Sequence, residues 1–302
     1  MMPDVSIIVV HWNVPALLDD CLRSIAQECA ATPDISTEML VVDCASPSET
    51  HRTVVARHDG VRLIALAENR GYAAGCNAGI AASDGRLVLL LNPDILLEAG
   101  VLGRLCHAFE IAEHIGMTAP ILRNADGSLQ SAGYAFPRPH HLLFDLLPVP
   151  GRLIESPLNG RVAVGDGMLP IRIDYPLGAA MCVRRRAIDD VGPLDEGYGM
   201  YSEEIDWARR FADHGWTTLL VPDARMVHLG GQSTGQQPTA MRSALWASRA
   251  RYGKRWWSKR DRRLASLIVA AGTRLRDFGA DAAQREENAQ IRSAFSEAAD
   301  NA

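Results

Sequence analysis

One pattern repeats through residues 5–120 and limits the folds that the chain can adopt. In each repeat a short apolar run, rich in β-branched residues, precedes an amphipathic stretch. Such runs predict strands buried on both faces, and apolar residues at helical spacing predict the helices between them. Because strands alternate with helices, we expect an α/β fold with a Rossmann-like, mainly parallel sheet flanked by helices. The expected strands are 5–10, 39–42, 61–64 and 86–91, and the expected helices are 15–30, 73–82 and 101–115.

The alternation stops after Pro120. Residues 121–170 are rich in glycine, proline and isolated polar residues, and Asp126-Gly127 is a turn signal between short extended pieces. We expect an irregular insertion near the functional site and assign no chemistry to it.

Regular structure is expected again beyond this insertion. Residues 171–183 predict two extended pieces divided at Gly178. A helix is expected over 202–214, because Ser202 is a favourable N-cap residue and acidic residues follow it in the first turn. Residues 216–221 predict a further strand.

Composition excludes several classes of protein. The chain has 302 residues, 47% of them apolar, which suits a globular protein with a sizeable core. Its net charge of -5 argues against a nucleic-acid-binding protein. The six cysteines form no C-x-x-C pair and lie mostly in apolar runs, as expected for reduced thiols of a cytosolic protein. Neither a signal peptide nor a membrane-spanning run is evident, so we expect a cytoplasmic protein with at most peripheral membrane contact.

Composition changes from about Met241. Residues 249–263 carry many basic residues interleaved with Trp256 and Trp257, and an apolar continuation follows. Basic residues, paired tryptophans and an apolar face are typical of a helix that lies in a membrane interface. We therefore hypothesise that residues 254–276 dock on the inner face of the membrane. The alternative is a helical hairpin or an oligomer contact.

Polar residues follow two of the expected strands at the point where each strand ends. Asn92-Pro93-Asp94 comes directly after one buried run, and Asp43 closes another. In an open α/β sheet, ligands bind beyond the carboxyl ends of the strands. Two carboxylates there suit the base or ribose of a nucleotide and a metal-bridged diphosphate, although aspartate is also common in turns. Because Asn69-Arg70-Gly71 lies between them in the sequence, we favour the binding site.

Three acids, Glu203, Glu204 and Asp206, crowd one turn of the expected helix. A carboxylate at a helix start that faces a cleft can act as a general base toward a hydroxyl, with a pKa tuned by its acidic neighbours. The alternative is that these acids only complement the positive end of the helix dipole.

His228 lies in a glycine-bounded loop after the expected strand and is a candidate metal ligand that would complete a site begun by Asp94. A lone histidine is more often structural, and spacing does not decide between the two. Arg249 and Arg251 would grip phosphate, or would remain solvated surface charges.

Taken in order, these motifs resemble the family 2 inverting glycosyltransferases of the GT-A fold. The nearest subgroup is the rhamnosyltransferase-like enzymes of bacterial cell-envelope polysaccharide synthesis. The resemblance runs from Val5 to about Tyr252 and rests on the order of the motifs. It implies a GT-A domain over residues 1–240 and a helical extension over 241–302. The domain would have a nucleotide-binding half (1–120) and an acceptor or catalytic half (121–240).

The resemblance also implies roles for individual residues. Asn92-Pro93-Asp94 stands for the Asp-x-Asp metal motif, with asparagine in the first acidic position, so Asp94 and His228 would hold the metal. Glu204 takes the position of the catalytic aspartate, with Glu203 and Asp206 as alternatives, and Gly178 and Ala179 lie on the acceptor side. The implied nucleotide-sugar-binding residues are His11, Asn13, Asp43, Asn69, Arg70, Gly71, Asn77, Asn92, Arg249 and Arg251.

The implied reaction is a single inverting displacement assisted by a divalent metal, Mg²⁺ or Mn²⁺. The acceptor hydroxyl, deprotonated by Glu204, attacks the anomeric carbon of a nucleoside-diphosphate sugar. The resemblance favours deoxythymidine-diphosphate rhamnose (dTDP-rhamnose) as the donor and a glycan or polyprenyl-linked acceptor, and it leaves the oligomeric state open.

Two other functions stay possible at this point. A sugar nucleotidyltransferase also uses metal-binding acids on a doubly wound sheet, but it would carry a glycine-rich phosphate loop where this chain has His11-Trp12-Asn13-Val14-Pro15. A nucleotide-sugar-binding protein that has lost catalysis would fit the two departures, Asn92 and Glu204.

Overall fold

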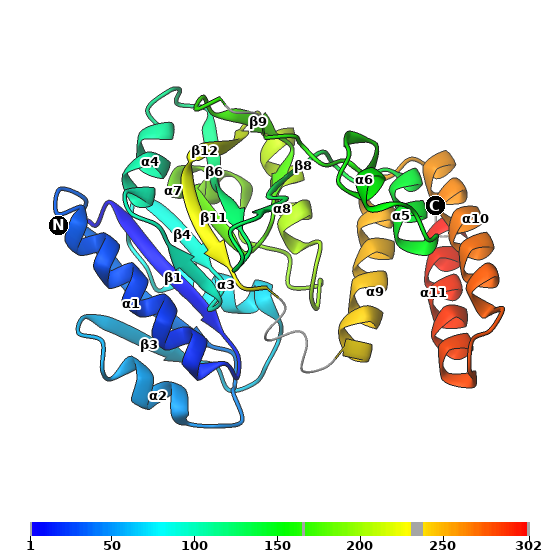
Figure 1. Ribbon diagram of the computed structural model, residues 1–302, viewed down its shortest axis with the longest axis horizontal. Coiled ribbons are helices and arrows are strands. Elements are labelled where there is room, and N and C mark those ends of the chain that lie inside the picture. The colour runs from blue at the N-terminus through cyan, green and yellow to red at the C-terminus, as the bar shows by residue number, and fades with distance from the viewer. Residues whose placement is uncertain (1, 165–166, 231–237, 301–302) are drawn as a thin grey trace.

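The computed structural model describes residues 2–164, 167–230 and 238–300. A central sheet has helices on both faces, and further helices lie together at one end of the molecule (Figure 1). Strand order in the sheet is β3-β2-β1-β4-β11-β6-β12-β5.

The first half confirms the expected alternation of strands and helices. Strands β1 to β4 are parallel neighbours in the order β3-β2-β1-β4. They are β1 (Val5–His11), β2 (Thr37–Asp43), β3 (Val61–Ala65) and β4 (Leu87–Leu91). The helices between them are α1 (Pro15–Ala31), α2 (Thr50–Val55) and α3 (Tyr72–Ala81).

Both faces of this sheet are buried, as the uninterrupted apolar runs predict. Successive residues of a strand point to opposite faces. Ile7 therefore packs against Leu18 and Leu22 of α1 in one hydrophobic core, whereas Ile8 belongs to the core on the other face with Trp207 and other residues. The carboxyl ends of β1, β2 and β4 consequently lie at one edge of a rigid layer.

The helix expected over 101–115 is wrong in its second half. Helix α4 (Val101–Ala108) ends early, and β6 (Ile115–Arg123) follows as a central, almost fully buried strand. Pro120 suggested a break because proline gives no N–H to a sheet ladder. It is tolerated because the pairing of β6 with β12 is irregular just beyond it, between Val221 and Arg225.

The second half makes the sheet mixed. Strand β11 (Ala180–Arg184) runs antiparallel between β4 and β6, whereas β12 (Thr217–His228) runs parallel to β6. The short β5 (Ile95–Leu97) pairs antiparallel with the end of β12. His228 is therefore the last residue of a long strand, and the expected loop position is wrong. This pairing brings His228 opposite Ile95, next to Asp94.

Residues 121–170 contain several short elements in place of a purely irregular insertion. Two paired strands, β8 and β10, form a small separate sheet, and β7 extends the main sheet beside β6. These elements and the neighbouring β9 are β7 (Leu129–Gln130), β8 (Gly133–Tyr134), η1 (Pro139–His141), α5 (Leu142–Leu146), α6 (Gly151–Ile154), η2 (Pro157–Asn159), β9 (Ile171–Ile173) and β10 (Tyr175–Pro176).

Helix α8 (Glu203–Asp213) begins where the sequence predicts, but Ser202 does not cap it. The backbone of Ser202 is left-handed (φ 67°), and its side chain accepts no capping hydrogen bond. An N-cap residue normally adopts extended geometry, which aims its oxygen at the first turn. The shorter helix α7 (Arg185–Val191) precedes this region.

The C-terminal helices form a third hydrophobic core, separate from the two sheet cores. They are α9 (Pro238–Trp256), α10 (Lys259–Asp277) and α11 (Ala282–Asp300). Leu142 and Leu146 of α5 complete this core with Trp246, Val269 and Phe295. Part of the insertion thus packs on the C-terminal helices, and the domain boundary near residue 240 stays a prediction. Among the described residues, no helix combines the length and apolar character that a membrane crossing requires.

Candidate active site

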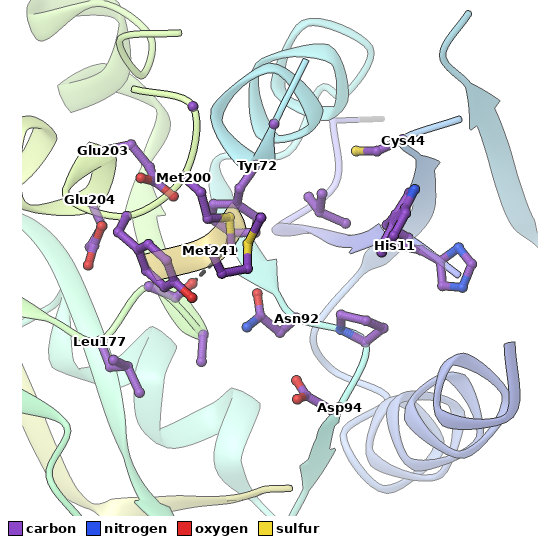
Figure 2. Close-up of a pocket in the computed structure, with 18 of the residues that line it drawn as sticks. His11, Cys44, Tyr72, Asn92, Asp94, Leu177, Met200, Glu203, Glu204 and Met241 are labelled. Atoms are coloured by element: carbon purple, nitrogen blue, oxygen red, sulfur yellow. Dashed lines mark hydrogen bonds between the residues drawn. The ribbon is translucent and has the colours of Figure 1, made fainter. Parts of the chain in front are cut away.

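A cavity of about 330 Å³ lies at the carboxyl edge of the sheet, within the size range of small-molecule sites. Its lining comes from the ends of β1, β4 and β12, the loop before α3, the start of α8 and the first turn of α9. Figure 2 shows Asn92 and Asp94 on one side and Glu203 and Glu204 on another, with Met200 and Met241 between them. Of the residues implied by the resemblance, the lining includes His11, Asn69, Gly71, Asn92, Asp94, Gly178, Ala179, Glu203, Glu204 and His228.

His11 lines the cavity, and Asp43 holds it in place from behind. The Nδ1 of His11 is 2.8 Å from the Asp43 Oδ1, and its Nε2 accepts a hydrogen bond from the Val14 N–H. Since Nε2 is an acceptor, the proton is on Nδ1 and is donated to Asp43. Burial raises the pKa of Asp43, but hydrogen bonds from His11 and from Ser46 outweigh it and lower that pKa to about 2.

Asp43 itself is not among the described lining residues of the cavity. Both of its oxygens accept hydrogen bonds, one from the Ser46 hydroxyl and the other from the Ser46 N–H. Asn13 is not among these lining residues either, and its N–H donates to the Ser46 hydroxyl. The role of Asp43 and Asn13 toward a nucleotide stays a prediction.

The loop before α3 packs tightly against the loop that leads into α8. Gly71 has a φ of +91°, and a Cβ there would lie 2.2 Å from the carbonyl oxygen of Gly199, so no other residue fits without moving backbone. The Asn69 side chain accepts a hydrogen bond from the Gly71 N–H at 3.0 Å. Arg70 pairs with Glu196 on the opposite loop.

Asn77 ties the same two loops together from α3. Its amide donates to the Leu194 carbonyl at 2.9 Å and to Glu196 at 3.0 Å, and it accepts from the Leu194 N–H at 3.0 Å. Neither Arg70 nor Asn77 is among the described residues that line the cavity. Both connect the loop before α3 to the loop that leads into α8.

Asp94 and His228 lie together at the floor of the cavity, both almost fully buried. The His228 Nε2 is 3.4 Å from the Asp94 Oδ1, and it has no hydrogen-bond partner among the described residues. The Nδ1 of His228 is 2.7 Å from the side-chain oxygen of Gln130. An imidazole nitrogen without a partner, beside a carboxylate, fits a divalent cation.

Asp94 and His228 would be only two protein ligands of such a cation, so a bound substrate would supply further oxygen donors. Within residues 2–164, 167–230 and 238–300, no three His, Cys, Asp or Glu side chains form a complete metal site. A cation on two protein ligands keeps positions for other oxygen donors, as Mg²⁺ does with substrate phosphates. None of the described lining residues is a lysine or an arginine, so such phosphates would meet no fixed positive charge.

Glu203 and Glu204 begin α8 and face the same cavity. Glu203 is 3% exposed, and burial together with the neighbouring Glu204 carboxylate raises its pKa well above the usual range. Burial raises the pKa of Glu204 to about 7, although backbone N–H groups at the helix start donate to it. The Glu204 side chain also lies against Gly178, the residue expected on the acceptor side.

Gly178 and Ala179 line the cavity, and the carbonyl group of each accepts a hydrogen bond from another lining residue. The Tyr72 hydroxyl donates to the Gly178 carbonyl at 2.8 Å, and the Asn92 N–H donates to the Ala179 carbonyl at 2.9 Å. This segment therefore links the loop before α3 to the end of β4. Tyr72 is a lining residue to which the sequence patterns assigned no separate role.

Asp206 points away from the cavity and is fully buried. Its carboxylate accepts from the Trp256 Nε1 at 2.8 Å and from the Arg210 Nε at 3.0 Å, and it is 3.2 Å from the Arg255 Nη1. The Tyr198 hydroxyl adds a hydrogen bond at 3.3 Å. Asp206 thus joins helix α8 to the end of α9.

Arg249 and Arg251 are also outside the set of described lining residues. Arg249 lies 2.9 Å from Asp145 and stacks over Trp246, whereas Arg251 lies 2.9 Å from Asp195. The sequence patterns assigned no separate role to Gln130, which contacts His228, or to the lining residues Met200, Tyr201 and Met241.

Comparison with known proteins agrees with this geometry. The model of glycosyl transferase family 2 matches residues 6–146. N-acetylglucosaminyl-diphospho-decaprenol L-rhamnosyltransferase of Mycobacterium tuberculosis is 28% identical over 218 residues, which cover 67% of this chain and 69% of that enzyme. The segment that this model matches is just under half of the chain. Together with the named relatives, it shows that the chain is a glycosyltransferase.

A second relative of the glycosyltransferase is the low-salt glycan biosynthesis hexosyltransferase of Haloferax volcanii. It is 27% identical over 218 residues, or 70% of this chain and 62% of that protein. With the mycobacterial enzyme, it shows that the similarity extends well past the residues that the family model matches.

Two solved structures share the GT-A fold of the glycosyltransferase. GalNAc-T7, solved with UDP, GalNAc and Mn²⁺, superposes with a TM-score of 0.63 at 14% identity, covering 98% of this chain. The chain spans only 56% of that protein's length. The mannosyltransferase PcManGT of Pyrobaculum calidifontis, solved with GDP-Man and Mn²⁺, gives a TM-score of 0.56 at 16% identity, covering 99% of this chain and 86% of that one. At these identities the likeness shows the fold, and it confirms the expected fold class.

Proposed function

We propose that this glycosyltransferase moves a sugar, with inversion, from a nucleoside-diphosphate sugar to a hydroxyl of a glycan or polyprenyl-linked acceptor. The observation that carries the proposal is the arrangement of one cavity. Glu204 lies on one side of it, at the start of α8, and Asp94 with His228 lies at the ends of β4 and β12. A base and a diphosphate-binding group on different walls leave room for a sugar between them.

Glu204 is the proposed general base. A base must be ionised near neutral pH and must reach the acceptor hydroxyl. Burial sets the pKa of Glu204 close to the working pH, and its side chain lines the cavity beside Gly178. It takes the proton of the acceptor hydroxyl as the oxygen attacks the anomeric carbon from the side opposite the leaving diphosphate.

Asp94 and His228 are the proposed ligands of a divalent cation, Mg²⁺ or Mn²⁺. When bound, such an ion neutralises charge that develops on the departing diphosphate. This need is acute here, because no arginine or lysine is among the described lining residues. Asn92 supplies a neutral amide next to the same site.

The nucleotide half of the donor is proposed to lie along the loop before α3 and beside His11. Asn69 and Gly71 offer polar and backbone groups there, and His11 is fixed by Asp43. Arg70 and Asn77 would act by holding that loop. The side chains of Arg249, Arg251 and Asp206 pair with other protein side chains away from the cavity. We therefore propose no contact between these three residues and the donor.

The donor we propose is dTDP-rhamnose, and the acceptor is a polyprenyl-linked sugar. Support for both comes from the mycobacterial relative, which is named as an L-rhamnosyltransferase of N-acetylglucosaminyl-diphospho-decaprenol. A lipid-linked acceptor would place the enzyme at a membrane surface, on the cytoplasmic side where nucleotide sugars are made.

We further propose that α10 docks on an anionic membrane. Its outward side carries Leu264, Leu267, Leu275 and the following Phe278, which are 48%, 68%, 59% and 85% exposed. Arg260, Arg263 and Arg274 are exposed on the same helix. Apolar side chains flanked by arginines suit an interface with anionic lipids.

Trp256 and Trp257 are not included in this proposed docking face. Trp256 donates to Asp206 and Trp257 donates to the Pro137 carbonyl, so both indoles bind within the protein. The proposed docking face therefore consists of the apolar side chains and arginines of α10, and a membrane role for the tryptophan pair stays a prediction.

A donor panel tests the proposed function. The purified protein is incubated with several nucleoside-diphosphate sugars and a polyprenyl-diphosphate-linked N-acetylglucosamine, with Mg²⁺, Mn²⁺ or EDTA, and nucleoside diphosphate release is measured. We expect release to be greatest with dTDP-rhamnose and to be lost with EDTA. Binding without release for every donor would indicate a protein that has lost catalysis, whereas pyrophosphate exchange would indicate a nucleotidyltransferase.

A further inference from the structure

Gln130 contacts His228 from a segment to which the sequence assigned no chemistry. It ends β7, which pairs with β6 through Gln130 and Leu122. Leu122 in turn pairs with Met226 of β12, two residues before His228. Leu129 is 60% exposed, and because neighbouring strand residues alternate sides, Gln130 points inward. Its oxygen accepts from the His228 Nδ1 at 2.7 Å.

This contact determines which ring nitrogen of His228 has a lone pair that can bind a cation. A side-chain amide oxygen only accepts hydrogen bonds, so Nδ1 must carry the proton that it donates. The Nε2 of a neutral imidazole is then left with its lone pair. That nitrogen is buried, faces the Asp94 Oδ1 at 3.4 Å and has no hydrogen-bond partner among the described residues.

We infer that Gln130 is a positioning residue that prepares His228 to bind a divalent cation together with Asp94. This rests on the proposed function, which makes Asp94 and His228 the cation ligands. Metal-binding histidines commonly donate their second ring N–H to an oxygen, which fixes the tautomer and the ring orientation. Without Gln130, His228 gains the freedom to turn or to place its proton on Nε2, where it blocks the ligand lone pair.

Metal affinity and the histidine tautomer together test this role. Mn²⁺ binding to the full chain is measured by electron paramagnetic resonance, with inorganic pyrophosphate present as a diphosphate probe. Gln130→Leu keeps the side-chain volume but removes the acceptor, so Mn²⁺ should bind about 10- to 100-fold more weakly. Gln130→Glu keeps an acceptor oxygen and should bind at least as tightly as the wild type. Leu129→Ser, on the exposed side of β7, is the matched control and should change nothing.

Nitrogen-15 NMR of the metal-free protein gives a readout that does not depend on activity or on bound metal. The His228 signals are assigned by their loss in His228→Gln. We expect a protonated Nδ1 in the wild type and in Gln130→Glu, and a shift toward protonated Nε2 in Gln130→Leu. A structural role for Gln130 alone would leave the tautomer unchanged.

The outcomes separate this inference from the proposed metal site. If Gln130→Leu binds Mn²⁺ as the wild type does while His228→Gln and Asp94→Ala bind it weakly, Gln130 has no positioning role and the metal site stands. If His228→Gln and Asp94→Ala also bind Mn²⁺ normally, both the metal site and the role of Gln130 are rejected.

Discussion

Glu203 and Glu204 are adjacent carboxylates with different surroundings. Glu203 is almost fully buried, one of its oxygens has no hydrogen-bond partner among the described residues, and burial together with the Glu204 carboxylate raises its pKa well above the usual range. Glu204 is open to the cavity and has a pKa of about 7. Because the pKa of Glu204 lies near neutral pH, Glu204 is the carboxylate of this pair that can take up and release a proton there.

Glu204→Gln tests the base directly. The amide cannot accept the proton, so kcat should fall about 10²- to 10⁴-fold while donor affinity stays within a factor of two or three. Calorimetry with the nucleoside diphosphate measures the affinity. A variant with most of its activity would move the base to Glu203 or Asp206.

The pH profile gives a second test of Glu204. A base must be unprotonated to act, so kcat/KM should rise with pH and level off above a pKa of about 7. Glu203 and the hydroxyls of Tyr72, Tyr134 and Tyr175 lie near enough to interact with this charge. Asp213→Asn, at the far end of α8, is the matched control and should keep the rise. A profile flat from pH 5 to 9 would argue against Glu204 as the base.

Helix α8 is held by contacts at both of its sides. The loop before it packs on Gly71 and is tied to α3 through Asn77. On the side that faces α9, Asp206 contacts Arg255 and Trp256. The position of Glu204 in the cavity therefore depends on α9, an element outside the segment that the family model matches.

Asp206→Asn should weaken the link between α8 and α9. Loss of the charge leaves Arg210 and Arg255 without their carboxylate, so the free energy of unfolding should fall by about 2–4 kcal/mol, less than for a fully buried pair because Arg255 is partly exposed. Trp256→Phe removes only one hydrogen bond and should cost about 1 kcal/mol. Urea denaturation measures both. Lost catalysis at unchanged stability, with the pH rise abolished, would instead make Asp206 the base.

At the scale of the whole molecule, the C-terminal helices lie at the end opposite β3 (Figure 1), and the first turn of α9 reaches the cavity. Their own core includes Leu142 and Leu146, so they are joined to the rest of the chain by packing as well as by sequence. The exposed apolar side chains of α10 face away from that core. The proposed docking of α10 would therefore use a face that this core leaves exposed.

Liposome flotation tests the docking face. The full chain should float with vesicles of phosphatidylglycerol and phosphatidylcholine, and less so at high salt, because the arginines contribute through charge. The double variant Leu267→Asp/Phe278→Asp should bind at least ten-fold more weakly, since two inserted apolar side chains are replaced by charges that anionic lipids repel. Leu129→Asp, at an equally exposed site off α10, is the control. Equal flotation of all three proteins would reject this face and favour an oligomer contact.

Much of the fold follows from the sequence alone. Buried strands and amphipathic helices each have a period that the sequence displays, so strands β1 to β4 and helices α1 and α3 are predicted close to their observed bounds. The short elements α2 and β5 are not predicted. The acids that end β2 and β4 and the acids that begin α8 are visible for the same reason. Strand β6 was missed because Pro120 is a local signal against a strand, and only the irregular pairing with β12 makes it acceptable.

Tertiary structure alone decides which candidate residues share the cavity. Asp206 is two residues from Glu204, which places it on the other side of the helix, and partners about fifty positions away occupy it. Gln130 and His228 are 98 positions apart, and only the ladder through β7, β6 and β12 brings them together. Local patterns record burial and backbone geometry, which depend on near neighbours. The direction and the partner of a polar side chain depend on long-range packing, which the sequence does not display.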